Sequence, residues 1–269
     1  MEYTRTVNFT EGEEIQLGGG LANAGKVVRV GNTVRRPLKP STPAIDRFLR
    51  YIREQGFEGA PEPLGRDSTG RSVYSFVEGE VDQDTNPAWA RDDDLLTSVA
   101  VLQHGLHDAS RGFVPLATDD WDMTLPWPGD KPSLVCHNDF CISNIVARDG
   151  RAIAVIDFDF LAPSHPLWDV AIALRHWLPI KDPVDLVGTD LDIPGRFARY
   201  CDAYGTAERS TVVTMVGDFL DQAFDSMKRR YEQGIPAYVA VWEAGYPAQN
   251  RRSRDWIDAN AHALRNARC

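Results

Sequence analysis

The chain has few cysteines and no long apolar run. Its cysteines, Cys136, Cys141, Cys201 and Cys269, show neither C-x-x-C spacing nor the ligand pattern of a zinc site. No apolar stretch approaches the roughly 18 residues that a membrane helix needs, and the N-terminus lacks the apolar core of a signal peptide. We therefore expect a protein of the reducing cytoplasm that does not bind membranes.

Positive charge is also scarce. The 269 residues include 29 lysines and arginines against 39 aspartates and glutamates, which gives a formal net charge of -10. Nonspecific binding to nucleic acids or anionic membranes requires a basic surface, so this composition disfavours both kinds of partner. A hydrophobic content of 43% is ordinary for a globular protein, and the length allows one large domain or two lobes.

The motif G-x-x-x-x-G-K-[ST] is absent, which disfavours a P-loop enzyme. A run of three glycines, Gly18, Gly19 and Gly20, does lie between β-prone segments at 15–17 and 26–30. Backbone amides can approach a phosphate closely where no side chain intervenes, so this turn could cover a nucleotide. A plain hairpin loop explains the glycines equally well.

The segment 137–157 carries the polar groups that phosphoryl transfer needs. It contains Asp139, then Asn144 five residues later, then Asp157 after a short hairpin. Pattern and spacing are similar to the H-x-D-x-x-x-x-N and D-F-G elements of kinases. A carboxylate at position 139 could accept the proton of an attacking hydroxyl, although either short pattern alone can arise by chance.

The residues between Asn144 and Asp157 read as a tight β-hairpin. An Asp-Gly turn at 149–150 separates two β-prone runs. Pairing the residues that flank this turn places Asn144 opposite Val155, with Asp157 as its diagonal neighbour. An amide oxygen and a carboxylate so placed could share one magnesium ion with nucleotide phosphates.

Another predicted strand, 33–36, ends in two arginines. Strand alternation puts Arg35 and Arg36 on opposite faces, so only one of them can face a nucleotide. We assign Arg36 to this role because Val34, on the same face, can supply a small apolar contact. The alternative is that both arginines are exposed at the end of the strand.

Residues 42–56 fit an amphipathic helix that begins with Thr-Pro and ends at Gly56. Asp46 is the acid available to pair with the strand cation, but the helix dipole explains its position equally well. Residues 61–65 read as a loop, 72–77 as a strand, and 78–80 as a hinge. We therefore expect an N-terminal lobe at 1–79 and a C-terminal lobe at 80–269.

The C-terminal lobe reads as mostly helical. Helices are predicted at 95–106 and from Pro166 onward, and a strand at 134–136 precedes the 137–157 segment. Asp169 would be costly to bury in its helix unless it accepted hydrogen bonds from backbone amides. One later helix has an apolar face that we expect to be core: Phe219, Leu220, Phe224, Met227 and Tyr231.

Five stretches of this chain resemble the aminoglycoside phosphotransferase family of kinase-like enzymes. They are residues 28–31 with 35–37, 75–80, 137–144, 156–159 and 166–169. The resemblance implies an α+β protein with a two-lobe, protein-kinase-like fold, whose N-lobe is small and β-rich and whose C-lobe is larger and helical. It also implies ATP or GTP and Mg²⁺ as cofactors between the lobes.

The resemblance also implies roles for single residues. Asp139 would be the catalytic base, and Asn144 and Asp157 would be magnesium ligands. The supporting residues are His137, Asp159, which replaces the glycine of D-F-G and could assist through a second metal, and Asp169, which would hold the catalytic loop. Nucleotide contacts would come from Arg36, Gly18, Gly19, Gly20, Phe76 and Val77.

The function that follows is transfer of the γ-phosphoryl group of a magnesium nucleotide to a hydroxyl of a small molecule, an aminoglycoside-like antibiotic being one candidate. Acids available to hold such an acceptor are Asp92, Asp93, Asp94, Asp159 and Glu243. The alternative is a non-catalytic kinase-like binding or immunity protein that sequesters a peptide or antibiotic. Kinases carry a lysine on the strand that corresponds to 33–36 and a glutamate on the helix that corresponds to 42–56, and the lack of both here favours that alternative. The intact set of Asp139, Asn144 and Asp157 argues against it.

Overall fold

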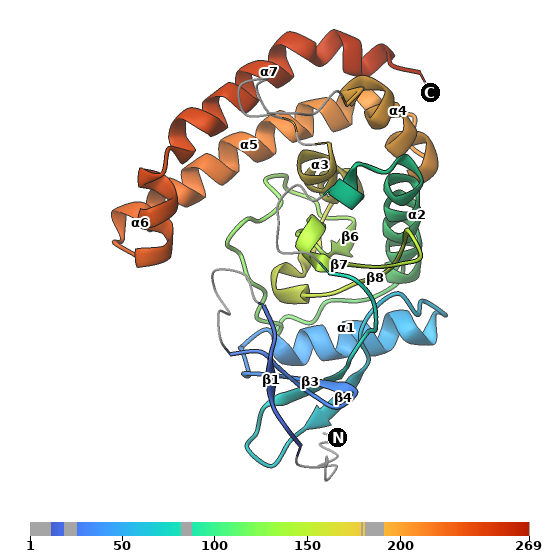
Figure 1. Cartoon of the computed structure of the whole chain (residues 1–269), viewed down its shortest axis with the longest axis vertical. Helices are drawn as coiled ribbons and strands as arrows, with labels where there is room; N and C mark the ends of the chain where they lie inside the picture. The colour runs from blue at the N-terminus through green and yellow to red at the C-terminus, as the bar shows by residue number, and fades with distance from the viewer. Residues whose placement is uncertain (1–11, 19–25, 82–87, 179, 181–190, 269) are drawn as a thin grey trace.

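The computed structural model describes residues 12–18, 26–81, 88–178, 180 and 191–268. In this part of the chain, an antiparallel sheet with one helix lies at one end and a larger, mainly helical body at the other (Figure 1). The α+β class is therefore confirmed. Within the described residues, no helix is both long enough and apolar enough to cross a membrane. The lobe boundary at residue 79 stays a prediction.

Five short strands form the N-terminal sheet in the order β1-β2-β3-β5-β4, and all neighbours are antiparallel. They are β1 (Ile15–Gln16), β2 (Val28–Val30), β3 (Thr33–Arg36), β4 (Pro63–Arg66) and β5 (Ser72–Ser75). The predicted loop at 61–65 is therefore partly wrong, because β4 begins within it. Proline and glycine suggested a loop, yet β4 lies at the edge of the sheet, where strands tolerate proline.

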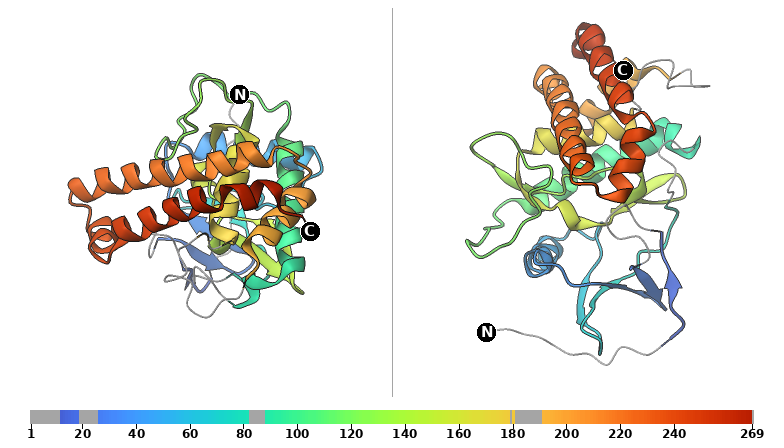
Figure 2. Two further views of the ribbon diagram at one scale, coloured as in Figure 1. Left: turned by 90° about the horizontal axis from the view of Figure 1, so that it is seen from above. Right: turned by 90° about the vertical axis from the view of Figure 1, so that its left-hand side faces the viewer.

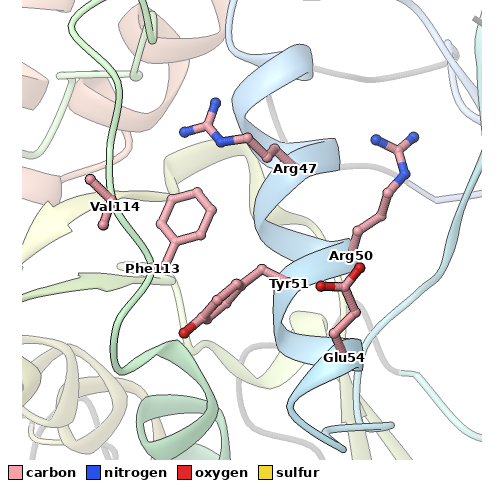
Figure 3. A pocket seen from close by; sticks show the side chains of 6 residues that line it. All are labelled: Arg47, Arg50, Tyr51, Glu54, Phe113 and Val114. Atoms are coloured by element: carbon pink, nitrogen blue, oxygen red, sulfur yellow. The ribbon is translucent and has the colours of Figure 1, made fainter. Parts of the chain in front are cut away.

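Helix α1 (Thr42–Glu54) buries the predicted apolar face, which consists of Ile45, Phe48, Leu49 and Ile52. It also contacts the segment that follows α2 (Asp93–Ser110). Arg47 of α1 binds Asp119 through two hydrogen bonds of 2.7 and 2.6 Å, and its guanidinium lies 4.9 Å from the centre of the Phe113 ring. Figure 3 shows Arg47 and Phe113 at a shallow pocket between these two elements.

The C-terminal body contains two small two-stranded sheets. Strand β6 (Leu134–Cys136) pairs with β9 (Ala162–Ser164), and β7 (Ile145–Arg148) pairs with β8 (Arg151–Val155). Glu80 links the N-terminal part to β7 through a bridge with Ala147. The described helices of this body are α2, α3 (Pro166–Trp177), α4 (Ile193–Tyr204), α5 (Arg209–Glu232), α6 (Pro236–Glu243) and α7 (Tyr246–Asn266).

The β7–β8 hairpin has the predicted Asp-Gly turn but not the predicted register. Asp149 and Gly150 both have positive φ, at 50° and 71°, as a type I′ turn requires. A bulge after Val146 shifts the pairing by one residue, so that Ile145 rather than Asn144 lies opposite Val155. The Ile156 amide then donates to the Asn144 carbonyl at 2.8 Å, which keeps Asn144 and Asp157 side by side.

Helices α5 and α7 lie side by side and extend beyond the body as an arm that ends in α6 (Figures 1 and 2). The apolar stripe predicted on α5 is core only near the body, where Phe219 and Leu220 are buried. Its other members are half-buried, where the helix extends into the arm: Phe224, Met227 and Tyr231.

Candidate active site

Strand β6 delivers the chain to the first candidate catalytic residue. Asn138 follows β6 with a φ of 60°, a left-handed conformation that its side chain supports by donating to the carbonyls of Cys136 and Phe160 at 3.0 and 3.1 Å. The next residue, Asp139, accepts a hydrogen bond of 2.8 Å from Nδ2 of Asn144. The structure therefore brings together the aspartate and the asparagine of the first motif.

Asp157 follows β8 and also adopts a left-handed conformation, with a φ of 63°. Its Oδ1 lies 2.8 Å from Nη2 of Arg36, and the same nitrogen lies 2.8 Å from Oδ2 of Asp159. The carboxylates of Asp157 and Asp159 thus bind the same nitrogen of Arg36, which projects from β3. Non-glycine residues in this backbone region cost energy, and such strain is common at functional sites.

The oxygen atoms around this point suit a magnesium ion. Because the Asn144 amide donates through Nδ2 to Asp139, its Oδ1 is directed elsewhere and accepts no hydrogen bond within the described residues. The carboxylates of Asp157 and Asp159 already share one cationic partner. Amide and carboxylate oxygens are hard ligands of the kind that Mg²⁺ takes beside phosphate oxygens and water. The donor set of Asn144, Asp157 and Asp159 therefore fits this ion.

The two strand arginines lie on opposite faces of β3, as alternation requires. Arg36 reaches Asp157 and Asp159, whereas Arg35 is buried on the other face, 3.7 Å from Asp67. Burial alone would lower the pKa of Arg36, but the charges of Asp157 and Asp159 outweigh this effect and raise it. Asp46, the acid that the helix offered as a possible partner of the strand cation, pairs with Arg66 and not with Arg36.

Asp46 has other partners. It accepts a hydrogen bond of 2.7 Å from the Tyr74 hydroxyl and lies 3.0 Å from Nη1 of Arg66. Aspartate is one methylene shorter than the glutamate of kinases, and here its carboxylate stays within the contact between α1 and the sheet. Its role is therefore structural, and among the described residues the ion-pair partners of Arg36 lie in the C-terminal body.

A second cation at this site was missed from the sequence. Nζ of Lys39 lies 2.6 Å from Oδ2 of Asp159, so that Arg36 and Lys39 together flank the two carboxylates. Lys39 lies beyond the end of β3 in a proline-containing turn, and no periodic pattern relates it to the strand. It supplies the compact ammonium that the strand itself lacks.

Asp139 lies in an environment that favours its protonated form. Burial raises its pKa, and the nearby negative charge of Asp157 raises it further, against the lowering effect of the hydrogen bond from Asn144; the result is a pKa of about 7. A carboxylate with a raised pKa is a stronger base than an ordinary aspartate. This environment suits a group that must accept a proton near neutral pH.

A chain of buried hydrogen bonds supports the backbone beside Asp139. Asp169 on α3 accepts a hydrogen bond of 2.7 Å from the Asn138 amide, and its other oxygen lies 2.9 Å from Nε2 of His107 on α2. Nδ1 of His107 in turn lies 2.8 Å from the Tyr204 hydroxyl on α4. Three helices therefore meet at one buried carboxylate that holds the 137–157 segment.

This cluster is not a metal site, although His107, Cys136 and Asp169 offer ligand atoms within 4.8 Å of one another. Both ring nitrogens of His107 are occupied, by Tyr204 and Asp169. Burial raises the pKa of the Cys136 thiol well above its usual value, so the thiolate that metals bind is disfavoured. The sequence signal for His107 was a row of polar residues on the buried face of α2: Gln103, His107 and Ser110.

His137 is a second supporting residue with defined contacts. Its Nε2 donates to the Ile156 carbonyl at 3.0 Å, and its Nδ1 accepts from the Asp139 amide at 3.2 Å. Burial lowers its pKa, so the neutral ring is favoured. The ring also packs edge-on against Phe158, at 4.6 Å between centres, and ties the strand before Asp139 to the segment around Asp157.

The predicted nucleotide-binding residues differ in exposure and in whether their backbone groups are free to bind a ligand. Gly18 is exposed beside β1, and Gly19 and Gly20 lie outside the described residues. The Phe76 amide donates to the Asn32 carbonyl at 2.9 Å and is therefore occupied. Val77, half-buried in the linker, has no backbone hydrogen bond to any described residue, so its amide and carbonyl remain available.

The acids considered for the acceptor do not converge. Asp92 caps α2 by accepting from the Leu95 amide at 2.8 Å, and Asp93 pairs with Arg196. Asp159 belongs to the cation site beside Arg36, whereas Glu243 is exposed at the end of α6. Among the described residues, these carboxylates do not form one pocket for a polycationic acceptor.

Comparison with known proteins identifies a family for part of the chain. Residues 117–211 match the phosphotransferase enzyme family. Over 170 residues the chain is 30% identical to the trifolitoxin immunity protein of Rhizobium leguminosarum bv. trifolii, and this match covers 62% of each chain. The chain thus spans less than two thirds of the length of that relative.

Solved structures share the whole fold. A microcompartment-associated aminopropanol kinase has a TM-score of 0.63 at 13% identity, covering 97% of this chain and 96% of its own. A choline/ethanolamine kinase family protein from Mesorhizobium loti has 0.57 at 18%, covering 95% and 89%. The GDP complex of aminoglycoside 2'-phosphotransferase-IIIa has 0.54 at 16%, covering 94% and 91%.

These structures are too distant in sequence to show more than the fold. The two-lobe, kinase-like fold expected from the motifs is confirmed. The resemblance to the aminoglycoside phosphotransferase family is likewise confirmed, so this chain is a kinase-like protein similar to that family.

Proposed function

We propose that this protein is a small-molecule phosphotransferase, which moves the γ-phosphoryl group of a magnesium nucleotide to a hydroxyl of its acceptor. The observation that carries the proposal is the grouping of Asp139, Asn144 and Asp157 beside Arg36 and Lys39. This site combines a base of raised pKa, oxygen ligands for a divalent ion and cations for phosphates. The matched family and the kinase-like fold support the same reaction class.

Each of these side chains has a part in the reaction. Asp139 orients the acceptor hydroxyl and takes its proton while the hydroxyl oxygen bonds to the γ-phosphorus. The bond from that phosphorus to its bridging oxygen breaks, and the nucleoside diphosphate leaves with the electron pair. Magnesium, held by Asn144 and Asp157, would neutralise charge on the phosphates. Most of the acceleration then comes from positioning and electrostatics.

Arg36 and Lys39 exchange partners when the nucleotide binds. In the structure they neutralise Asp157 and Asp159, which would otherwise face each other as like charges. A triphosphate offers both cations new anionic partners, and the metal then takes their place beside the carboxylates. The donor is ATP or GTP, and the available Val77 amide and carbonyl in the linker would contact its base.

Nucleotide binding is tested by thermal unfolding with magnesium and ATP or, separately, GTP. A ligand at about 100 times its dissociation constant adds roughly 2.7 kcal/mol, which moves Tm by a few degrees. We expect this magnesium-dependent rise for the wild-type protein and for Asp255→Ala, an exposed acid on α7. Asp157→Ala should lose it. A wild-type response in Asp157→Ala would contradict the metal-ligand assignment.

A second candidate is a non-catalytic immunity protein that sequesters a peptide or antibiotic, favoured by the match to the trifolitoxin immunity protein. Asp139→Asn distinguishes the two functions. Loss of a general base slows a reaction by about 100- to 10,000-fold. If the protein is a phosphotransferase, Asp139→Asn should therefore fail to transfer phosphate and to protect cells against the peptide or antibiotic, while nucleotide binding persists. Full protection by Asp139→Asn would instead establish sequestration.

A further inference from the structure

The backbone around Asp139 has no regular secondary structure and is held by side chains. Residues 137–141 belong to no helix or strand. Buried backbone groups in such a stretch need other hydrogen-bond partners. The Asp139 amide lies 3.2 Å from Nδ1 of His137, and the Asp139 carbonyl accepts a hydrogen bond of 3.0 Å from Nδ2 of Asn144. Both partners belong to the 137–157 segment itself, so they shape this stretch but do not fix its place in the protein.

Two hydrogen bonds from helix α3 supply that outside support. Asp169, in the first turn of α3, accepts a hydrogen bond of 2.7 Å from the Asn138 amide. Trp177, the last residue of α3, donates from Nε1 to the Phe140 carbonyl at 3.0 Å. Asn138 and Phe140 come directly before and after Asp139 in the sequence. Helix α3 therefore holds the chain on both sides of the candidate base.

The dimensions of the helix and of the chain agree with this arrangement. Trp177 follows Asp169 by eight residues, which places the two about 12 Å apart along the helix and about 80° apart around it. Helical side chains lean toward the N-terminus, so the long indole of Trp177 extends back toward Asp169. An extended chain advances by about 3.3–3.6 Å per residue, so the three residues 138–140 span at most roughly 10 Å. One helix can therefore contact both ends of this stretch.

Burial shows that the Trp177 contact lies in the protein interior. Asn138 is 4% exposed and Phe140 is 0% exposed, whereas Asp139 between them is partly accessible. Trp177 is itself only 1% exposed, so solvent hardly competes for the Phe140 carbonyl. Loss of the indole N–H would leave this carbonyl without a partner that bulk water can readily replace.

We propose that Trp177 is a positioning residue for Asp139, and that Trp177 and Asp169 together form a two-point anchor on α3 that fixes the candidate base relative to the magnesium ligands. The inference rests on the proposed phosphotransfer and adds a residue to that site. Trp177 acts through the Phe140 carbonyl, not by touching the nucleotide. A displacement of about 1 Å at a reacting group can lower a rate roughly 100-fold, so an anchor at this distance from the base affects the reaction.

Two changes at Trp177 test this role. Trp177→Phe removes the N–H together with part of the ring, whereas replacing Trp177 with 3-benzothienylalanine keeps the two-ring shape and removes the N–H alone. Trp168→Phe is the matched control. Trp168 lies on the same helix and is 0% exposed, and its Nε1 has no hydrogen-bond partner among the described residues. The control therefore loses the same atoms from the core without losing a hydrogen bond to the backbone beside Asp139.

Hydrogen–deuterium exchange of a peptide that covers residues 137–144 measures the anchor without any acceptor. We expect about tenfold faster exchange there in both Trp177 variants, and wild-type exchange in Trp168→Phe. Exchange in α2 should stay at the wild-type rate, because only local opening is expected. Unchanged exchange at 137–144 in the Trp177 variants would overturn the anchor. An equal rise in Trp168→Phe, or a matching rise in α2, would show general loosening of the core and overturn it too.

Release of phosphate from magnesium ATP or GTP, with water as the acceptor, measures the effect on the reaction. We expect the Trp177 variants to lose about 10- to 100-fold in kcat while the KM for nucleotide stays within about twofold, and Trp168→Phe to match the wild type. An unchanged kcat, or a KM that rises in step with the loss, would contradict the positioning role. No magnesium-dependent nucleotide binding by the wild-type protein would instead contradict phosphotransfer. The exchange measurement decides about the anchor in either case.

Discussion

At the scale of single residues, two carboxylates of low exposure, those of Asp67 and Asp139, show how the environment decides what an aspartate can do. Burial by itself would raise the pKa of Asp67, but hydrogen bonds from Thr69 and Arg71 and the charge of Arg71 outweigh it and lower the pKa to about 2. Burial, together with the negative charge of Asp157, raises the pKa of Asp139 to about 7. The first is locked as an anion that stabilises the sheet, whereas the second can exchange a proton.

The lowered pKa of Asp67 predicts a pH-dependent loss of stability in Asp67→Asn. Because the folded-state pKa lies below the ordinary value of 3.8, the stabilisation is complete above that pH and disappears as the pH falls through about 2. The variant should be about 2 kcal/mol less stable at pH 7, and roughly half of that difference should remain at pH 3. Urea unfolding at both pH values measures it. A difference that does not change with pH would mean that the charge of Asp67 is not what stabilises the sheet.

At the scale of elements, the sequence was sufficient where local chemistry alone determines the structure. The Asp-Gly turn, the apolar face of α1 and the helix that begins at Pro166 are all present as expected. The bulge after Val146 could not be predicted, because it depends on contacts of β7 with its surroundings, such as the bridge from Glu80 to Ala147. The edge strand β4 was not predicted in full, because its proline and glycine are more typical of a loop.

The candidate site residues also divide into those that the local sequence indicates and those that only the folded chain brings together. Asp139, Asn144 and Asp157 were recognisable because they share one short stretch of chain, and the structure places them together. Lys39 carries no motif, and only the folded chain brings it near the carboxylates. Phosphotransfer roles for these residues stay predictions, of which Asp139→Asn and Asp157→Ala test two.

The chain of hydrogen bonds that joins α2, α3 and α4 predicts that His107→Leu impairs the 137–157 segment from a distance. Removing one partner of a buried charge costs about 3–5 kcal/mol, because Asp169 would stay buried with fewer hydrogen bonds. We expect that loss in urea unfolding, together with a lower kcat at little change in the KM for nucleotide. His104→Leu, one turn earlier on α2 and half exposed, is the control and should change little. Equal effects of both variants would argue against a special role of His107.

At the scale of the whole molecule, paired charges connect the N-terminal sheet and its helix to the rest of the protein. One connection, from Arg36 and Lys39 to Asp157 and Asp159, lies at the candidate active site and must change when a nucleotide binds. The other, from Arg47 to Asp119, lies near the middle of α1 and involves no candidate site residue. The second contact can therefore keep the two parts together while the first exchanges its partners.

This arrangement predicts that Arg47→Met weakens the contact between the parts without removing the active-site groups. The side chain of Asp119 is 4% exposed while Arg47 covers it, so loss of Arg47 leaves a carboxylate at the surface without its bidentate partner, at a cost of about 1 kcal/mol. Asp119→Ala should cost less, and the double variant should be more stable than the sum of the two losses implies, because neither charge is then left unpaired. Urea unfolding of the three variants measures this coupling.

Since Arg36 and Lys39 stay in place, Arg47→Met should still show a magnesium-dependent thermal response to nucleotide. Strict additivity of the two single losses would show that the pair does not link the parts, and a lost nucleotide response would show that α1 positions Arg36 through it.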